Sequence, residues 1–397
     1  MKEALTILKE NGKEAFLGAK AEWQQVFGSA DCAPFLSWEW MSTWFECFGE
    51  KKEPVVLKAY RNGRVAAILP FCFEKKRILG KPASSLTLMS AGIGGADYLG
   101  MISRPADQAE VASAMIKFLN HEGGFDSVCF AGIDNDSEIA SVLRSTCVDK
   151  GAEELRVSES VGAVCPQIDL AAGWNNVLDR SKRKSNFTRK LKKLEGIPGF
   201  EFRSITSAHE TGAAFERFLQ LHEKRWKGAG GSELSGHPRL VAFQRKLVPQ
   251  LASAGLVRFD ELWLEGRCRS SIYGLDNGRT FYFYNSGYDL GCSHLSVGLA
   301  VLGLSIKNAI ERGNSVYDFL RGDEAYKFEW ANRQKELICV NVYRDSIELR
   351  ANDALNSTLT ALKNFSKNAL PSTIADTIGA WRRARRRRYE LSGEGAN

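Results

Sequence analysis

The chain of 397 residues lacks the sequence signals of several protein classes. Its nine cysteines are odd in number, and no pair has the CxxC or CxxH spacing that is typical of a structural zinc site. No apolar run approaches the roughly 18 residues of a membrane-spanning helix. Met1–Lys20 carries charged residues throughout and has no apolar core of signal-peptide length. These absences argue against zinc-stabilised, membrane-spanning and secreted proteins.

Most of the cysteines lie among apolar neighbours, as Cys72 does between Phe71 and Phe73. Cysteines in this setting behave as small buried hydrophobic residues and stay reduced in a reducing compartment. We therefore expect a cytoplasmic protein without a bound metal. Peripheral contact with the inner face of a membrane is an open alternative.

The positive charge is concentrated in one segment. The net charge is +7, and six arginines within Trp381–Arg388 supply almost all of it. A protein that coats nucleic acid would spread its positive charge over the surface. Residues 351–397 are predicted to form a helical, arginine-rich tail. This tail either packs as a helix pair with a solvated charge run or contacts anionic lipid through Arg382–Arg388.

The same order of elements occurs twice along the chain. Two apolar strands flank Asn62-Gly63-Arg64, and two more flank Glu265-Gly266-Arg267, as expected for tight hairpins. A further strand and a long helix that stops before Gly313 follow the second pair. Strands are predicted at 55–60, 65–73, 126–130, 256–264, 268–275, 280–285 and 315–320, and helices at 106–119 and 296–312.

This repetition predicts an α/β (α+β) fold of two tandem domains, 1–165 and 166–350, with a hinge near Cys165-Pro166. Each domain is expected to hold a mixed, mostly antiparallel sheet flanked by helices. In the first, Trp40, Trp44 and Phe48 share one helix face. Such a face more often packs in a core than lines a substrate groove.

A loop of small residues, Gly287–Gly298, precedes the long helix. Backbone N–H groups at a helix start, together with the helix dipole, favour an anion such as phosphate. Small residues are also common at ordinary helix starts. The predicted phosphate-binding residues are Ser293, His294, Leu295, Ser296, Val297 and Gly298.

Three further segments combine charged and aromatic residues. Tyr317–Trp330 places six ionisable side chains after a buried strand, where α/β sheets open their ligand crevices. Arg180–Leu194 is a basic helix with one apolar stripe, suited to a phosphate-bearing substrate, a membrane surface or plain solvation. His222, Arg225 and Trp226 share one helical turn, although a lone histidine in such a place is more often structural than catalytic.

The order of these segments resembles one family. The marks are Phe218, Leu221-His222 and Arg225-Trp226, then strands, a small-residue loop opening a helix, and Tyr317–Lys327 with Trp330. Over about residues 30–345 the sequence resembles the CelD-like, or BioF2-like, acyltransferase branch of the GNAT superfamily, which is related to the FemAB and FemX aminoacyltransferases. One departure is Ser293–Gly298, which lacks the proline of the family's Ser-Pro-Gly-like turn.

The resemblance implies a tandem GNAT-like fold that uses acetyl-CoA or another acyl-CoA. The donor's arm would separate two parallel strands, and its pyrophosphate would lie on Ser293–Gly298. An amine would then attack the thioester directly, with a base taking the amine proton and an acid protonating the thiolate. Candidate bases are Asp318, Asp323, Glu324 and His222. Candidate acids are Tyr326, Tyr288 and Tyr284. Predicted substrate-binding residues are Arg321, Lys327, Arg225, Trp226 and Tyr284.

Three functions are consistent with the sequence. The first is an acyl-CoA-dependent N-acyltransferase, most simply an acetyltransferase, acting on a sugar, nucleotide-sugar or lipid-linked amine in exopolysaccharide or envelope biosynthesis. The second is a FemX-like transferase that uses aminoacyl-tRNA, with RNA held by 180–194 and the arginine tail. Against it, the long helical insertion of some FemAB members is absent. The third is a non-catalytic, membrane-recruited assembly factor on the same fold.

Overall fold

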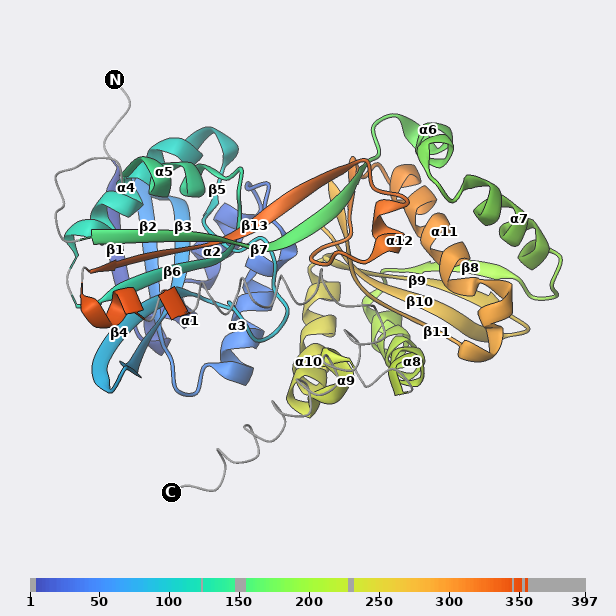
Figure 1. The fold of residues 1–397 in the computed structure, drawn as a ribbon, viewed down its shortest axis with the longest axis horizontal. Coiled ribbons are helices and arrows are strands. Elements are labelled where there is room, and N and C mark those ends of the chain that lie inside the picture. The colour runs from blue at the N-terminus through green and yellow to red at the C-terminus, as the bar shows by residue number, and fades with distance from the viewer. Residues whose placement is uncertain are drawn as a thin grey trace.

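One mixed β-sheet runs through both halves of the chain (Figure 1). The computed structural model describes residues 5–355 apart from 123, 147–154, 228–231, 345, 352 and 353. Within them, the sheet has 13 strands, and helices flank it in both halves. The predicted α/β fold with tandem, mostly antiparallel halves is therefore confirmed. The arginine run of the predicted tail lies outside the described residues.

The N-terminal half supplies the elements drawn in blue to green (Figure 1). They are β1 (Thr6–Asn11), α1 (Lys13–Gly18), α2 (Lys20–Phe27), η1 (Pro34–Leu36), α3 (Trp38–Phe48), β2 (Glu53–Arg61), β3 (Arg64–Ile78), β4 (Lys81–Leu88), β5 (Ile102–Ser103), η2 (Pro105–Asp107), α4 (Gln108–His121), β6 (Ser127–Asp134), α5 (Glu138–Thr146) and β7 (Leu155–Asp169).

The C-terminal half supplies the remaining described elements. They are α6 (Gly173–Arg180), α7 (Lys184–Glu195), β8 (Glu201–Ile205), α8 (Ala208–Lys227), α9 (Glu233–Gly236), α10 (Pro238–Ser253), β9 (Val257–Leu264), β10 (Arg267–Asp276), β11 (Thr280–Tyr288), η3 (Leu290–Leu295), α11 (Val297–Glu311), β12 (Val316–Asp318), α12 (Ala325–Phe328) and β13 (Arg333–Arg344).

The hairpins follow from their turn residues. Asn62 and Gly63 have φ of 54° and 69°, and Glu265 and Gly266 have φ of 51° and 72°. Positive φ at both central residues defines the turn whose twist suits a two-residue hairpin. The strand predicted at 315–320 is shorter, because the chain leaves the sheet after Asp318.

Each half contains one parallel strand pair joined by a helix. β4 and β6 pair in parallel with α4 between them, and β11 and β12 pair in parallel with α11 between them. All other described strand pairs are antiparallel. The two halves thus repeat one arrangement, as the repeated sequence pattern predicted.

Two long strands join the halves (Figure 1). The end of β7 pairs with β12 of the C-terminal half, and the rest of β7 pairs with β13. In turn, β13 pairs with β6 of the N-terminal half. Each half therefore receives a strand from the other. The boundary predicted at residue 165 falls inside β7, and the division into 1–165 and 166–350 stays a prediction.

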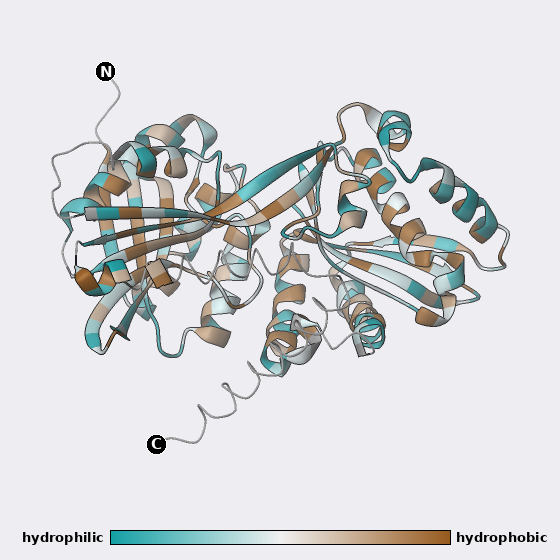
Figure 2. Ribbon diagram, in the orientation of Figure 1, coloured by the Kyte–Doolittle hydropathy of each residue, from teal (hydrophilic) through white to brown (hydrophobic). Residues whose placement is uncertain are grey.

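Two large hydrophobic clusters form the core around the sheet. One includes α3, α4, α8 and α10, and it continues across both halves through Tyr282 of β11. The other lies beneath α11 and includes Phe187 of α7 and Trp330. Figure 2 shows α11 rich in hydrophobic residues, whereas α7, which packs outside it, is largely hydrophilic. The described helices include none long and apolar enough to cross a membrane.

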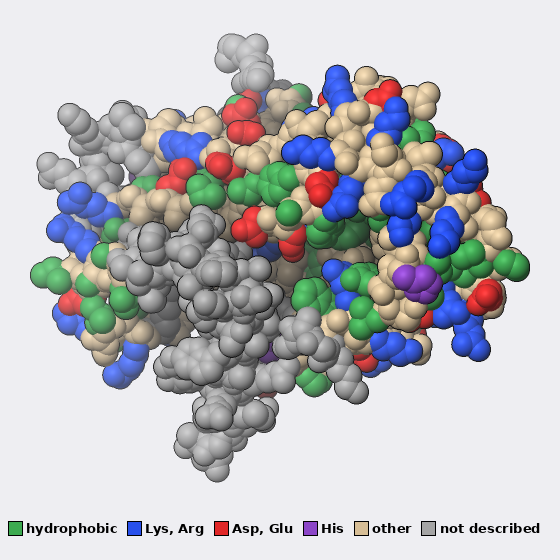
Figure 3. Space-filling view, turned by 45° about the vertical axis from the view of Figure 1, so that its right-hand side comes forward, with side chains coloured by type: hydrophobic (Ala, Val, Ile, Leu, Met, Phe, Trp, Pro, Cys, Tyr) green, Lys and Arg blue, Asp and Glu red, His purple; other side chains and the backbone are tan. Residues whose placement is uncertain are grey.

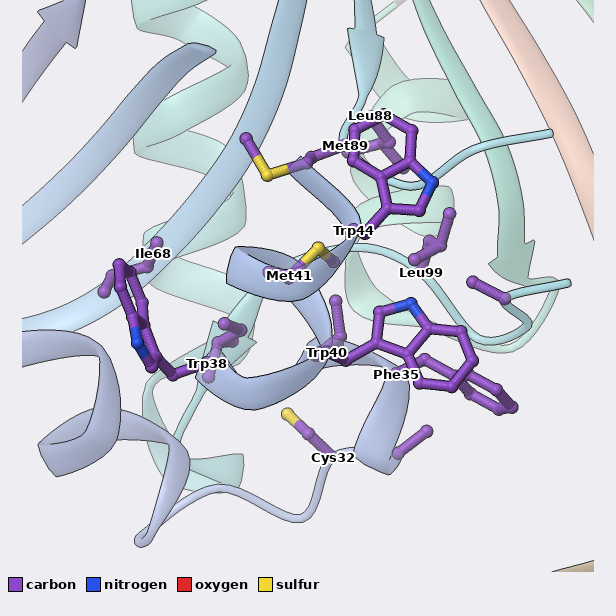
Figure 4. Close-up of a cluster of buried hydrophobic side chains, with 14 of the residues drawn as sticks. Cys32, Phe35, Trp38, Trp40, Met41, Trp44, Ile68, Leu88, Met89 and Leu99 are labelled. Atoms are coloured by element: carbon purple, nitrogen blue, oxygen red, sulfur yellow. The ribbon is translucent and has the colours of Figure 1, made fainter. Parts of the chain in front are cut away.

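The aromatic face of α3 lies in the core (Figure 4). Trp40, Trp44 and Phe48 are all buried, which confirms core packing over a groove wall. The indole N–H of Trp40 donates to Ser90 Oγ at 2.9 Å, and that of Trp44 donates to the Ile93 carbonyl at 2.8 Å. The helix thereby fixes the glycine-rich loop that follows β4. Half of the eight described cysteines are buried.

Candidate functional site

A gap opens in the sheet between β11 and β12. The two strands pair in parallel over only three residues, ending at Tyr282 and Asp318. Beyond this point β11 continues to Tyr288, while the chain after Asp318 turns away. Tyr284 forms a bulge, because Tyr273 pairs with Asn285 and Gly274 with Phe283. Past Tyr282, the side of β11 that faced β12 therefore borders the gap, while its other side still pairs with β10.

A cavity lies on each side of this gap. The first, called here the α11 cavity, has a volume of about 300 Å³ and lies beside the start of α11. The second, called the α10 cavity, has a volume of about 360 Å³ and lies beside α10 and the glycine-rich loop of the N-terminal half. Both are lined by Arg225, Phe283, Ser286 and Tyr326. The gap is therefore where the two cavities meet.

The start of α11 forms one wall of the α11 cavity. Ser296 has a left-handed backbone, with φ of 59°, and reverses the chain between η3 and α11. Four of the six predicted phosphate-binding residues, Ser293, Ser296, Val297 and Gly298, line the cavity. The first N–H groups of a helix have no partner within the helix, so this turn suits an anion.

The other two predicted phosphate-binding residues, His294 and Leu295, do not line the cavity. Leu295 packs against the core beneath α11, and the carbonyl of His294 accepts a hydrogen bond from Lys190 Nζ at 2.9 Å. Arg183 and Asn186 of the basic segment also line the cavity, and Arg183 pairs with Glu329 at 2.5 Å. Figure 3 shows many Lys and Arg side chains on the right of the view, over the C-terminal half.

The α10 cavity joins both halves of the chain. Gly94, Gly95 and Asp97 of the glycine-rich loop line it together with Tyr284 of β11. The Tyr284 hydroxyl donates to the Gly94 carbonyl at 3.0 Å and accepts from Gln244 Nε2 at 3.0 Å. A Cβ on Gly95 would lie 2.8 Å from the Tyr284 hydroxyl oxygen, so this close approach requires glycine.

Two predicted substrate-binding cations in this cavity are already paired. Arg321 donates from Nε to Asp97 Oδ1 at 2.5 Å and from Nη2 to the Ala96 carbonyl at 2.7 Å. Lys327 lies 2.9 Å from Glu324 Oε2 and donates to the Arg321 carbonyl at 2.9 Å. Arg321 therefore links the C-terminal half to the loop of the N-terminal half, and Lys327 holds the turn after β12.

Arg225, Trp226 and Tyr326 lie at or beside the junction. Arg225 and Tyr326 line both cavities, and Trp226 lines the α10 cavity. Burial raises the pKa of Tyr326 well above its usual range, and nearby Glu324 raises it further. The Tyr326 hydroxyl therefore keeps its proton at neutral pH. Tyr288, the third candidate acid, lines the α11 cavity only.

Three of the four candidate bases line neither cavity. Asp318 lines a separate cavity of about 630 Å³ and accepts hydrogen bonds from the Tyr98 hydroxyl and Gln167 Nε2, both at 2.6 Å. Asp323 is exposed and is not part of either wall. Glu324 is the candidate base that lines the α10 cavity.

His222, the fourth candidate base, is buried in α8. Its Nδ1–H donates to the Ser286 carbonyl at 2.9 Å, which leaves Nε2 to accept from Ser232 Oγ at 2.7 Å. Burial lowers its pKa, so the ring is neutral. One ring nitrogen thus binds the backbone of β11 and the other binds Ser232, so both are used in contacts that stabilise the fold.

Several wall residues were not among the predicted site residues. Asp97, Gly94 and Gly95 come from the first half, and Gln244 comes from α10. The one sequence signal for the first three was the glycine cluster 92–95, followed by Asp97. No metal-binding group of three or more His, Cys, Asp or Glu occurs in the described part of the chain.

Comparison with known families addresses the C-terminal half. Residues 181–328 match the family model described as "Acetyltransferase (GNAT) domain". The C-terminal half contains a GNAT domain. The gap, the α11 cavity and Tyr326 all lie within or beside the matched residues. No curated protein sequence matches the chain.

Solved structures share the fold over most of the chain. The crystal structure of FemX matches with a TM-score of 0.56 at 11% identity and covers 85% of this chain and 97% of that one. The C-terminal domain (DUF2156) of a putative lysylphosphatidylglycerol synthetase from Agrobacterium fabrum matches with a TM-score of 0.52 at 10% identity and covers 87% and 96%. A conserved protein of unknown function from Bacteroides thetaiotaomicron matches with a TM-score of 0.51 at 10% identity and covers 82% and 97%. At identities of 10–11%, the similarity to these structures shows a shared fold and nothing about activity.

Proposed function

We propose that this chain is an acyl-CoA-dependent N-acyltransferase of the CelD-like, or BioF2-like, kind. Its donor is acetyl-CoA or a similar acyl-CoA, and its acceptor is an amine on a sugar, nucleotide-sugar or lipid-linked precursor. The observation that carries the proposal is the junction at the β11–β12 gap, where two cavities share Arg225, Phe283, Ser286 and Tyr326. A donor and an acceptor that enter from opposite sides of the sheet would meet there.

The α11 cavity fits the donor. The first turn of α11 and the hydroxyls of Ser293 and Ser296 suit phosphate oxygens, and Phe283, Val301 and Leu302 offer an apolar wall for the arm. A bound acyl-CoA supplies a thioester. Backbone groups of β11 beyond Tyr282 face the gap, so an N–H there is placed to polarise the thioester carbonyl.

The α10 cavity holds the acceptor amine in this proposal. The amine nitrogen attacks the thioester carbonyl carbon, so that a C–N bond forms and the C–S bond breaks. Glu324 receives the proton that the amine loses, directly or through water. The leaving thiolate takes the hydroxyl proton of Tyr326, which lines both cavities. Tyr326 then regains a proton from solvent, and the products are an amide and free CoA.

The test begins with donor binding. Isothermal titration of the full chain with CoA and acetyl-CoA is expected to give micromolar affinity, and CoA release measured with a thiol reagent should depend on added amine. Ser296→Asp places a carboxylate where phosphate would bind and should weaken CoA binding about tenfold or more. Ser296→Asn is the matched control, since asparagine also tolerates a left-handed backbone. Equal affinity for both variants would contradict the assigned phosphate site.

A second candidate is transfer from aminoacyl-tRNA, as in a FemX-like enzyme. The exposed basic residues of α7, Lys184, Arg189, Lys192 and Lys193, favour it, because α7 packs against α11 and these side chains could bind a nucleic-acid backbone. The fold shared with FemX is compatible with it. Failure of CoA to bind, together with salt-dependent binding of aminoacyl-tRNA, would favour this candidate. Absence of both would favour a non-catalytic role.

A further inference from the structure

Three cations line the α10 cavity, and they differ in their partners. Arg321 is paired with Asp97, and Lys327 is paired with Glu324. Arg225 has no carboxylate within 4.0 Å among the described side chains. Its printed hydrogen bond runs from Nη1 to Ser286 Oγ at 3.2 Å. Among the described residues, Arg225 is therefore the cation of this cavity that has no ion-pair partner.

Two aromatic rings hold this guanidinium in place. Its central carbon lies 4.7 Å from the ring centroid of Tyr288 and 5.2 Å from that of Trp226. Stacking of this kind orients the planar group while leaving its edge N–H groups available. An arginine edge that is fixed in this way matches a carboxylate or phosphate, which accepts two parallel hydrogen bonds.

Trp226 adds a second donor beside Arg225. Its indole Nε1 is buried and has no hydrogen-bond partner among the described residues. Leaving such a donor unpaired is costly, so a ligand oxygen that accepts from it would be favoured. The adjoining residues 228–231 read Gly-Ala-Gly-Gly and carry no charged side chain. The uncompensated charge and the unpaired donor thus lie on neighbouring residues at the end of α8.

The location of the two groups indicates which substrate they meet. Arg225 lies at the shared wall, whereas Trp226, Arg321 and Lys327 line only the α10 cavity. The unpaired donor of Trp226 therefore lies on the acceptor side of the gap, and Arg225 borders the same cavity. We propose that the acceptor is an amine that also carries an anionic oxygen group close to the reacting nitrogen, and that Arg225 and Trp226 bind this group. This inference rests on the proposed acyltransferase function and names its substrate class.

The experiment compares matched acceptors on the full chain with acetyl-CoA. Each of three pairs joins an amine that carries an anionic group to a relative that lacks this group: 4-aminobutyrate and its amide, lysine and lysinamide, and glucosamine 6-phosphate and glucosamine. The first two pairs test a carboxylate and the third tests a phosphate. We expect kcat/KM for at least one anionic member to exceed that of its neutral partner by about 10-fold to 100-fold.

Variants connect this preference to Arg225. Arg225→Gln should lower kcat/KM for the anionic acceptor, mainly through KM, by a larger factor than for the neutral one, and Arg225→Lys should restore part of the difference. The acceptor KM should change more than the Kd for CoA. Arg245→Gln is the matched control, because Arg245 is an exposed arginine on α10 that pairs with Glu216. It should leave the preference intact.

The outcomes separate the inference from the proposed function. Transfer to charged and neutral acceptors at equal rates, or an equal loss on both in Arg225→Gln, would overturn the inference and leave the acyltransferase standing. Absence of CoA binding and of transfer to every amine would overturn both. A preference that Arg225→Gln removes and Arg245→Gln keeps would support the inference.

Discussion

The pH dependence of stability should carry a contribution from Asp318, which is fully buried at the end of β12. Its Oδ2 accepts from the Tyr98 hydroxyl and from Gln167 Nε2, both at 2.6 Å, and its Oδ1 accepts from the Leu320 N–H at 2.6 Å. Burial raises the pKa of this carboxyl from 3.8 to about 6, although the three hydrogen bonds act in the opposite direction. The native state therefore binds this proton more tightly than the unfolded chain does.

Proton linkage determines the sign and the size of the contribution that Asp318 makes to the free energy of unfolding. Below about pH 3 the carboxyl is protonated in both states, and above about pH 7 it is ionised in both. Between these limits the native state holds a proton that the unfolded state has lost, so stability falls as the pH rises. A rise in the pKa of Asp318 from 3.8 to about 6 corresponds to about 3 kcal/mol in the free energy of unfolding. This contribution is absent when the carboxyl is replaced by an amide.

The assay is denaturant unfolding of the wild type and Asp318→Asn at pH values from 4 to 7. The amide has a pH-independent cost, since its NH₂ group cannot accept from a donor that faces the oxygen it replaces. The stability of the wild type relative to the variant should nevertheless fall by about 2 kcal/mol across this range, because the carboxyl of the unfolded chain is already partly ionised at pH 4. Asp179→Asn, which alters an exposed carboxylate paired with Lys184, controls for surface charge. A difference that is constant or rises with pH would refute the reasoning.

Three other substitutions test roles of individual residues. Tyr326→Phe should lower kcat for acyl transfer about 100-fold with little change in the Kd for CoA, because it removes the proton donor at the junction. His222→Ala should lower the free energy of unfolding by about 2–4 kcal/mol through a cavity and unpaired groups, yet keep the shape of the pH–rate profile. Gly303→Ala should cost about 1–3 kcal/mol in denaturant unfolding, because a Cβ would lie 2.1 Å from the Phe187 ring. Gly212→Ala, which meets open space in α8, should be neutral or stabilising.

Local elements of the fold could be predicted because short segments determine them. The Asn62-Gly63 turn needs two residues that tolerate positive φ, and the sequence provides them where the hairpin forms. The helix predicted at 296–312 appears as α11, because its apolar run and Gly313 mark where it packs and stops. Of the residues predicted to bind phosphate, Ser293, Ser296, Val297 and Gly298 line the cavity beside the start of α11, and their role stays a prediction.

The exchange of β7 and β13 could not be predicted, because strand pairing between distant segments leaves no local pattern. The role of Asp318 was equally hidden. Successive residues of a strand point to opposite faces, so Tyr317 lies under α11 while Asp318 faces another cavity. The density of charged residues in 317–330 predicted a site nearby, but density does not show which side chain faces the gap. Asp97 was missed because its partner, Arg321, is 224 residues away.

The strand exchange also bears on whether the predicted division at residue 165 marks a folding unit. A fragment of residues 166–350 would keep only the last residues of β7, and its β13 would lose pairing with both β6 and most of β7.

The same fragment would expose core that the N-terminal half covers. Phe243 of α10 packs against Trp40 and Phe48, with ring centroids 5.6 and 5.3 Å apart. Unpaired strand edges and exposed aromatic rings favour aggregation. We therefore expect the fragment to show no cooperative unfolding transition by circular dichroism, whereas the full chain does. A soluble fragment that unfolds cooperatively and binds CoA would mean that the GNAT domain folds alone, and that the exchanged strands and the glycine-rich loop serve the acceptor site rather than the fold.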